Sequence, residues 1–242
     1  MFPLALLNKS SPPSPPVDPS LTLALLHFDG DNNTQVFTDS SQNNQNIITD
    51  SSTGVYLSNT WAKFGSTSCF FDGASLRTSS DYLGGNIGAS DWQIDCFIRP
   101  NSVSGQKGIF NIYNDFSHTP INLKLVSGVL TLQVQVLDDS SWQYTLTHQT
   151  VLVANTEYHI RALRKDGHLR IFVDGVEASS SGTNIGTASL VQSGSGAFYI
   201  GSAWNYMGGF TQPFQGYIDE FRIRKEAVYT GNFTPPTSPF AY

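Results

Sequence analysis

The residue types that most often carry out catalysis are scattered along this chain of 242 residues. Its histidines lie far apart in sequence, at His27, His118, His148, His159 and His168. The chain contains no H-E-x-x-H, C-x-x-C or G-x-S-x-G motif, which are patterns of zinc sites and serine esterases. Asp138 and Asp139 are adjacent, so in a strand they would point to opposite faces. We therefore expect a protein that is not an enzyme.

Aromatic residues beside polar turns are better candidates for a binding site. The glycine-rich segment 201–210 contains Trp204 and Tyr206. A second pair, Trp142 and Tyr144, follows a turn that we expect at residues 138–141. Flat aromatic rings pack against the C–H faces of sugars, while neighbouring polar groups bond to the hydroxyls. These four residues are our candidates for glycan binding. The alternative is that their rings cover edges of the core or a subunit interface.

Charge and hydropathy disfavour two classes of partner. The formal net charge is -6 at pH 7, and no block of Lys or Arg is present to follow a phosphate backbone, so we expect no nucleic-acid binding. No stretch approaches the roughly 18 apolar residues that cross a bilayer, so we expect no membrane partner. Residues 1–7 are apolar but follow no basic segment, which makes them a poor signal peptide.

Most of the chain after residue 20 alternates between apolar and polar residues with the period of a β-strand. The segment 129–136 (VLTLQVQV) places Leu and Val on one face and Thr and Gln on the other. The segment 91–99 (DWQIDCFIR) alternates likewise, and Pro100 is expected to end its ladder. Cys69 and Cys96 fall in such segments, so we expect buried free thiols.

Turn signals join these segments into antiparallel pairs. Asp166 and Gly167 separate the strand-like segments 157–165 and 169–173, which predicts a tight hairpin. A late strand is predicted at 214–223. Because no helical stripe is present to cover a parallel sheet, the sequence predicts an all-β fold, a two-sheet antiparallel β-sandwich.

A proline-rich arm, residues 1–20, precedes this predicted domain at 21–242. Proline fixes φ and removes an amide donor, so the arm favours an extended polyproline conformation outside the core. An extended segment can lie across a partner surface at low ordering cost. We therefore predict that the arm anchors the domain through Phe2, Leu4, Leu6, Pro12, Pro13, Pro15 and Pro16. The alternative is a disordered linker.

Seven fragments along the chain occur in an order typical of one family. They are LHFDG at 26–30 with VFTDSS at 36–41, KFGS at 63–66 with FDG at 71–73, IDCFIRP at 94–100, YHIRALR at 158–164, LRIFVDG at 169–175, YIG at 199–201 and GYIDEFRI at 216–223. In this order they resemble the laminin G-like or concanavalin A-like jelly-roll domains. The ending AVYTGNFTPPTSPF at 227–240 is similar to jelly-roll proteins encoded in tailed-bacteriophage genomes.

The resemblance implies a jelly-roll module on the surface of a tailed-bacteriophage virion, on capsid or tail, assembled in the host cytoplasm. Its partners would be other virion structural proteins and host-surface polysaccharide. The chain itself would form a homo-oligomer or occur in many copies in the particle. A free carbohydrate-binding lectin is the alternative. A polysaccharide depolymerase is less favoured, because the E-x-D-x-E triplet of the family's glycosidases is missing.

The resemblance also implies a calcium site. Many domains of this family hold Ca²⁺ where an early acidic loop meets the late G-x-I-D-E strand, and hard cations prefer oxygen ligands. The corresponding residues here are Asp39 and Asp219, with Asp29 a weaker candidate. The alternative is that Asp39 caps a turn and Asp219 accepts backbone hydrogen bonds.

Overall fold

The prediction of an all-β fold is confirmed by the structure, a computed structural model. It describes residues 18–49, 53–78, 87–113, 119–136, 143–190, 197–205, 209–210, 212–228 and 231–241, with the backbone alone at 204–205 and 209–210. Apart from one 3-10 turn at Pro19–Leu21, the regular elements of these residues are strands. No helix among them is long and apolar enough to cross a bilayer.

The strands form two large antiparallel sheets and one small hairpin. The nine-stranded sheet contains β1 (Thr22–Leu26), β3 (Val55–Ser58), β4 (Ser68–Asp72), β6 (Trp92–Pro100), β11 (Tyr158–Lys165), β12 (His168–Val173), β13 (Val176–Glu177), β14 (Thr183–Asn184) and β18 (Gln215–Arg224). The seven-stranded sheet contains β2 (Ile47–Thr49), β5 (Leu76–Thr78), β7 (Gln106–Tyr113), β8 (Ile121–Val126), β9 (Val129–Val134), β10 (Tyr144–Val151) and β15 (Ala197–Ile200). The small hairpin pairs β16 (Trp204–Asn205) with β17 (Gly209–Phe210).

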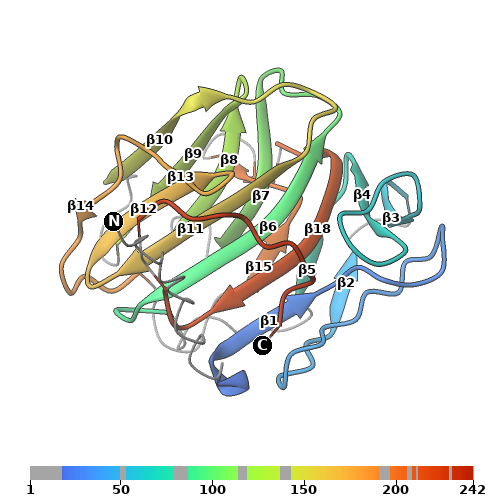
Figure 1. The fold of residues 1–242 in the computed structure, drawn as a ribbon, viewed down its shortest axis with the longest axis horizontal. Coiled ribbons are helices and arrows are strands. Elements are labelled where there is room, and N and C mark those ends of the chain that lie inside the picture. Colours follow the sequence, from blue (N-terminus) through green and yellow to red (C-terminus); the bar gives the residue numbers. More distant parts are fainter. Residues whose placement is uncertain are drawn as a thin grey trace, which may run out of the picture.

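Strands distant in sequence lie side by side in both sheets. The nine-stranded sheet has the order β13-β12-β11-β6-β18-β4-β3, and β1 also pairs with β18. In Figure 1 the last strand, β18 in red, therefore lies between β6 in green and β1 in blue. The seven-stranded sheet has the order β10-β9-β8-β7-β15-β5-β2, so β7 to β10 form a meander and β15 joins them to the early strands.

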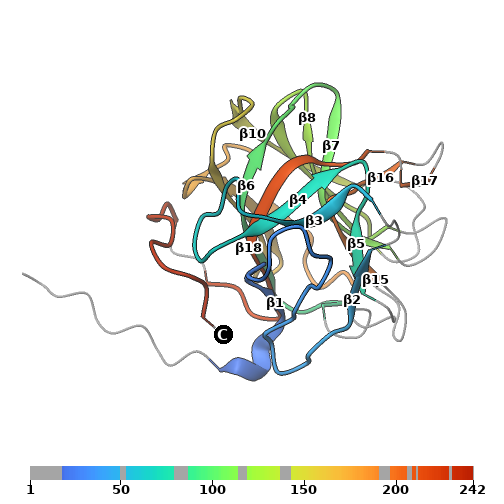
Figure 2. The same cartoon turned by 90° about the vertical axis from the view of Figure 1, so that its right-hand side faces the viewer.

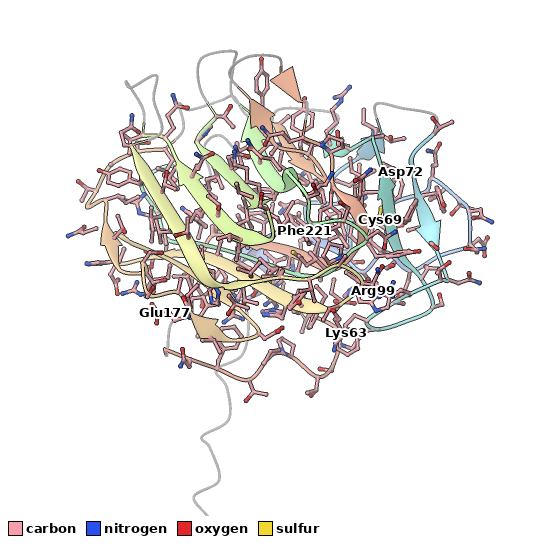
Figure 3. All side chains as sticks on the ribbon, turned by 90° about the horizontal axis from the view of Figure 1, so that it is seen from above. Lys63, Cys69, Asp72, Arg99, Glu177 and Phe221 are labelled. Carbon is pink, nitrogen blue, oxygen red and sulfur yellow. The ribbon has the colours of Figure 1, made fainter. Side chains whose placement is uncertain are left out.

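The core lies between the two sheets, and alternate residues of the long strands such as β6 and β9 point into it. Phe221 of β18 is fully buried there, and Figure 3 shows it between the sheets. Cys69 and Cys96 belong to the same core and form no disulfide, which confirms the prediction of buried free thiols. Burial of this kind is the main term that stabilises a sandwich, since two sheets share one apolar interior.

The strands and turns predicted from alternation are confirmed with small shifts at their ends. The segments predicted at 129–136, 91–99 and 214–223 are β9, β6 and β18. Asp166 and Gly167 have φ of 50° and 74° at the hairpin between β11 and β12, as the mirror-image turn of a hairpin requires.

The described part of the C-terminal segment, residues 231–241, packs on the outer face of the nine-stranded sheet. Phe233 donates its amide to Gly175 O, and Phe240 donates its amide to Glu220 Oε2 at 2.7 Å. The red coil in front of β11 and β6 in Figure 1 is this segment. Figure 2 shows hairpin β16–β17 on the opposite side of the molecule. The two sheets therefore have differently covered outer faces.

Candidate binding face on the seven-stranded sheet

The outer face of the seven-stranded sheet carries a continuous line of polar side chains. Residues such as Leu132, Leu123 and Phe110 point into the core, so their neighbours in sequence point outward. The strand register aligns one outward residue from each of six adjacent strands. We call these six the polar row: Thr145, Gln133, Asn122, Asn111, Tyr199 and Arg77.

The middle of the polar row is buried although it faces away from the core. Asn111 and Asn122 have no exposed surface. The Asn111 amide donates to Ser202 O at 2.9 Å, so residues 201–203 lie over β7. Within the described part of the chain, Asn111 Oδ1 has no hydrogen-bond partner. A buried carbonyl oxygen without a donor costs about 1–3 kcal/mol.

A second line of outward residues runs beside the polar row. Lys124 on β8 lies between Thr131 on β9 and Gly108 on β7. Lys124 Nζ donates to Gln106 Oε1 at 2.7 Å, and burial lowers the pKa of this ammonium group. The described strands of this sheet contain neither Asp nor Glu. The described strands therefore present mainly amide and hydroxyl side chains on this face, with two cationic side chains, Lys124 and Arg77.

Hairpin β16–β17 is attached to the same face. Gly201 donates its amide to Ile109 O, and Gly108 donates its amide to Gln212 O at 2.8 Å, which fixes both ends of the segment to β7. A Cβ at Gly108 would lie 2.0 Å from Ala203 N, so only glycine permits this close approach. The backbone of Trp204, a predicted glycan-binding residue, therefore lies next to the polar row. Its side chain and all of Tyr206 lie outside the described residues.

The second predicted aromatic pair is at the other edge of the sheet. Trp142 lies outside the described residues. Tyr144 pairs with Val134 and packs against the core while remaining partly exposed. Its ring therefore covers an edge of the core, as in the alternative stated for these aromatics. The polar row was not identified from the sequence, although the alternation of Asn122 and Lys124 in INLKLV marked the polar face of β8.

The two predicted calcium ligands both accept backbone hydrogen bonds. The Asp39 carboxylate, 3% exposed, accepts from the amides of Leu25, Ser41 and Gln45 at 2.8–2.9 Å. The Asp219 carboxylate accepts from the amides of Lys63, Phe64 and Glu220. Burial raises the pKa of Asp219 to about 7, against the opposing effect of these donors.

No group of three or more His, Cys, Asp and Glu side chains that could hold a metal ion occurs among the described residues. Asp29, the weaker candidate, accepts the amide of Ser66 at 2.8 Å. Calcium binding at Asp39 and Asp219 remains a prediction. The seven predicted anchoring residues of the arm, from Phe2 to Pro16, lie outside the described residues.

Comparisons with known proteins place this geometry in a family. Residues 72–229, more than half of the chain, match the concanavalin A-like lectin/glucanases superfamily. No curated protein sequence matches the chain. Among solved structures, domain 4 of AbnA, a GH43 extracellular arabinanase from Geobacillus stearothermophilus in complex with arabinotriose, has a TM-score of 0.66 and 22% sequence identity. The match covers 86% of this chain and 94% of that one.

Two toxin domains are similar at lower identity. The receptor binding domain of botulinum neurotoxin D has a TM-score of 0.62 and 13% identity, over 87% of this chain and 50% of that one. The serotype D ligand binding domain in complex with N-acetylneuraminic acid has a TM-score of 0.59 and 14% identity, over 87% and 49%. The chain thus spans about half of these toxin domains. Together with the family match they confirm the predicted jelly roll, and the chain belongs to the concanavalin A-like lectin/glucanases superfamily.

Proposed function

We propose that this chain is a carbohydrate-binding module that holds a neutral glycan on the polar row and does not cleave it. The observation that carries the proposal is a row of amides and hydroxyls in which the buried Asn111 Oδ1 has no hydrogen-bond partner among the described residues. Sugar hydroxyls both donate and accept hydrogen bonds, and a few well-placed polar groups beside an aromatic ring are typical of small-ligand sites. Tyr199 supplies the ring within the row.

Binding without cleavage is supported by the composition of the sheet. Glycosidases need two carboxyl groups on either side of the scissile bond, one as general acid and one as nucleophile or base. The outward positions of the described strands of the seven-stranded sheet carry Asn, Gln, Thr and Lys, and none of them carries a carboxyl group. Two similar structures, in complex with arabinotriose and with N-acetylneuraminic acid, add precedent for sugar ligands among proteins that contain this fold.

The test is calorimetric titration of the full chain with arabinotriose and with neutral oligosaccharides chosen by glycan array. Gln133→Ala removes a partly exposed amide of the row and should weaken binding about tenfold, the effect of one or two lost hydrogen bonds to a ligand. Gln149→Ala removes an exposed glutamine of β10 outside the row and should leave affinity unchanged. Equal affinities for the Gln133→Ala variant and the wild type would contradict the proposal.

The finer hypothesis concerns where the module is displayed. Display on a tailed-bacteriophage particle, through the arm at 1–20, is supported by the resemblance of the segment 227–240 to phage jelly-roll proteins. Mass spectrometry of purified virions would give the copy number, with hundreds of copies expected for a capsid site and a few for a tail site. A chain that lacks residues 1–19 should fold but not be incorporated. Incorporation of that truncation would contradict an anchoring role.

A further inference from the structure

A cavity with polar lining residues lies beside β3, at the edge of the nine-stranded sheet. It has a volume of about 380 Å³, which falls in the range of about 300–1,000 Å³ found for small-ligand sites. Its lining residues are Asn33, Gln35, Thr53, Gly54 and Tyr56, and none belongs to the polar row. Figure 2 shows the blue loop after β1, which supplies Asn33 and Gln35, lying against β3.

The chemistry of this lining suits a neutral polyol. Among the described residues it contains two amides, one hydroxyl and one phenol ring, and no charged side chain. A neighbouring hollow of about 320 Å³, lined by the same loop, contains Asp29 and Asp31. Together with the net charge of -6, these carboxylates disfavour an anionic ligand. The cavity therefore favours a neutral sugar over a uronic or sialic acid.

The cavity is held open by main-chain contacts of the loop. Asn33 donates its amide to Leu57 O at 2.8 Å, and Leu57 donates its amide to Thr34 O at 2.9 Å, so the loop pairs with β3 like an additional strand. Gln35 Nε2 donates to Val55 O at 2.7 Å. These contacts order the loop before a ligand arrives, which lowers the entropic cost of binding.

Gly54 lines the cavity in a backbone conformation that suits glycine. Its φ is +85°, and a Cβ at this position would lie 2.5 Å from Asp72 O. Any other residue would therefore be strained there. The position of Tyr56 two residues later on β3 places its ring at the edge of the cavity.

An aromatic row continues from the cavity across the outer face of the sheet. The ring centroids of Tyr56 and Phe70 are 5.1 Å apart, and those of Phe70 and Tyr217 are 5.0 Å apart. Trp61 lies 6.0 Å from Tyr217, and the Arg99 guanidinium lies 5.9 Å from the same ring. Tyr56, Phe70 and Trp61 are partly exposed. The rings come from three adjacent strands, β3, β4 and β18, so they form a line rather than a cluster.

We propose that this cavity and the aromatic row form a second binding site for a neutral oligosaccharide, on the sheet opposite the polar row. One sugar occupies the cavity against Tyr56, with its hydroxyls bonded to the amides of Asn33 and Gln35. The next sugar packs on the partly exposed ring of Phe70, which Tyr217, itself buried, supports from the neighbouring strand. A polysaccharide long enough to reach both sites would bind more tightly than either site alone allows, because the second contact is intramolecular.

The test compares Tyr56→Ala, Tyr56→Phe and Asn59→Ala in the full chain, by calorimetry and protein-observed NMR with neutral oligosaccharides. Tyr56→Ala removes the packing surface and should weaken binding at this site tenfold or more, whereas Tyr56→Phe keeps the ring and should cost only about two- to threefold. Asn59→Ala removes an exposed amide that follows β3 outside the cavity, and it should leave affinity unchanged. Thermal melts establish that each variant is folded.

The stoichiometry of binding and the affinity of each site distinguish the two sites experimentally. The wild type should bind two oligosaccharides, and Tyr56→Ala and Gln133→Ala should each keep one site at wild-type affinity while the other is weakened. A folded Tyr56→Ala variant with unchanged affinity and stoichiometry would overturn the second site while leaving the proposed function intact. A Tyr56→Ala variant that loses all binding would support the cavity and contradict the polar row. A wild type that binds no neutral oligosaccharide would overturn both.

Discussion

Asp95 shows how a single charged residue can be held inside this sandwich. It is fully buried on the outer face of β6, where it accepts from Arg161 Nε at 2.6 Å, Arg222 at 3.2 Å and Gln93 Nε2 at 2.6 Å. Burial opposes ionisation, but the two guanidinium groups outweigh it and hold the pKa of Asp95 well below its usual range. Asp95 therefore stabilises the fold above its ordinary pKa, and this contribution is lost in acid.

Removal of the Asp95 charge should be far more costly than removal of a surface charge. Asp95→Asn leaves two guanidinium groups buried without a counter-ion, and loss of one partner of a buried pair typically costs about 3–5 kcal/mol. Glu157→Gln removes a partly exposed partner of Lys63 and should cost less than about 1 kcal/mol. Urea unfolding at pH 7 measures both. Similar free energies of unfolding for the two variants would contradict this account of Asp95.

His159 should make a second contribution to the free energy of unfolding that is lost in acid. It is 1% exposed, its Nε2 lies 3.6 Å from Asp95 Oδ1, and burial lowers its pKa to about 4 from 6.5. Because the unfolded chain takes up this proton first, the stability present above pH 6.5 is lost as pH falls towards 4, at up to about 1.4 kcal/mol per pH unit.

Replacement of His159 by a residue that does not titrate should flatten the pH dependence. His159→Phe keeps a ring that packs on Phe97, and His159→Gln keeps polarity without a proton. The free energy of unfolding of both variants should fall less steeply than that of the wild type between pH 6.5 and 4.5, in urea titrations at several pH values. Three equal slopes would show that His159 does not take part.

At the scale of elements, the segment 231–241 covers part of the outer face of the nine-stranded sheet. Phe240 stacks on Phe97 with ring centroids 5.9 Å apart, and the Arg222 guanidinium lies 4.5 Å from the Phe240 ring. Phe233 lies 4.0 Å from the Arg161 guanidinium in the same way. The segment therefore covers the charged groups around Asp95. Because it excludes water from them, the local dielectric constant falls and the ion pairs of Asp95 with Arg161 and Arg222 become stronger. The segment thus has a role within the fold itself.

Truncation of Phe240 should destabilise the protein strongly. Phe240 is 5% exposed in a small cluster with Leu25 and Phe97, and Phe→Ala in such a position costs about 3–5 kcal/mol. Val228→Ala, at a residue 48% exposed, should change stability by less than about 0.5 kcal/mol. Guanidinium unfolding of both variants is the measurement. A Phe240→Ala variant as stable as Val228→Ala would mean that the segment does not contribute to the fold.

At the scale of the whole molecule, a single core shared by two sheets makes local opening costly. Cys69 and Cys96 lie in strands β4 and β6 with no exposed surface, and burial raises the pKa of both thiols above the ordinary value. Thiolate is the reactive form of cysteine, so both burial and the raised pKa suppress reaction. The reactivity of these thiols therefore reports opening of the sandwich.

Neither cysteine should react with a thiol reagent in the native protein. Both should be labelled together as the chain unfolds in denaturant, at the midpoint seen by circular dichroism, because they belong to one core. Labelling followed by mass spectrometry at each denaturant concentration gives the two curves. Modification of one thiol well before the other would indicate that the sheets open separately.

Calcium, if bound at Asp39 and Asp219, should stabilise the folded chain, since a ligand that binds only the native state raises its stability. Chelation should then lower the melting temperature, and elemental analysis should find the metal. The Asp39→Asn variant should melt at a temperature that chelation no longer changes. An unchanged wild-type melt with no metal detected would contradict calcium binding.

Local alternation alone determined the all-β class, the core faces of β6 and β9, the hairpin at Asp166 and Gly167, and the two buried thiols. Each follows from residues close in sequence, because side chains alternate along a strand and a tight turn needs positive φ. The family was also recognisable, because its fragments keep their order along the chain.

Only the tertiary structure decided which strands are neighbours, and therefore which polar residues meet. The polar row joins Arg77 to Asn111 through Tyr199, and the aromatic row joins Tyr56 to Tyr217 through Phe70. Alternation shows that these residues face outward, but it does not show which residues lie beside them. Strand pairing depends on packing and hydrogen bonds between segments that can lie more than 100 residues apart, as Arg77 and Tyr199 do. The polar row and the aromatic row both arise from that pairing, so local sequence patterns could not reveal them.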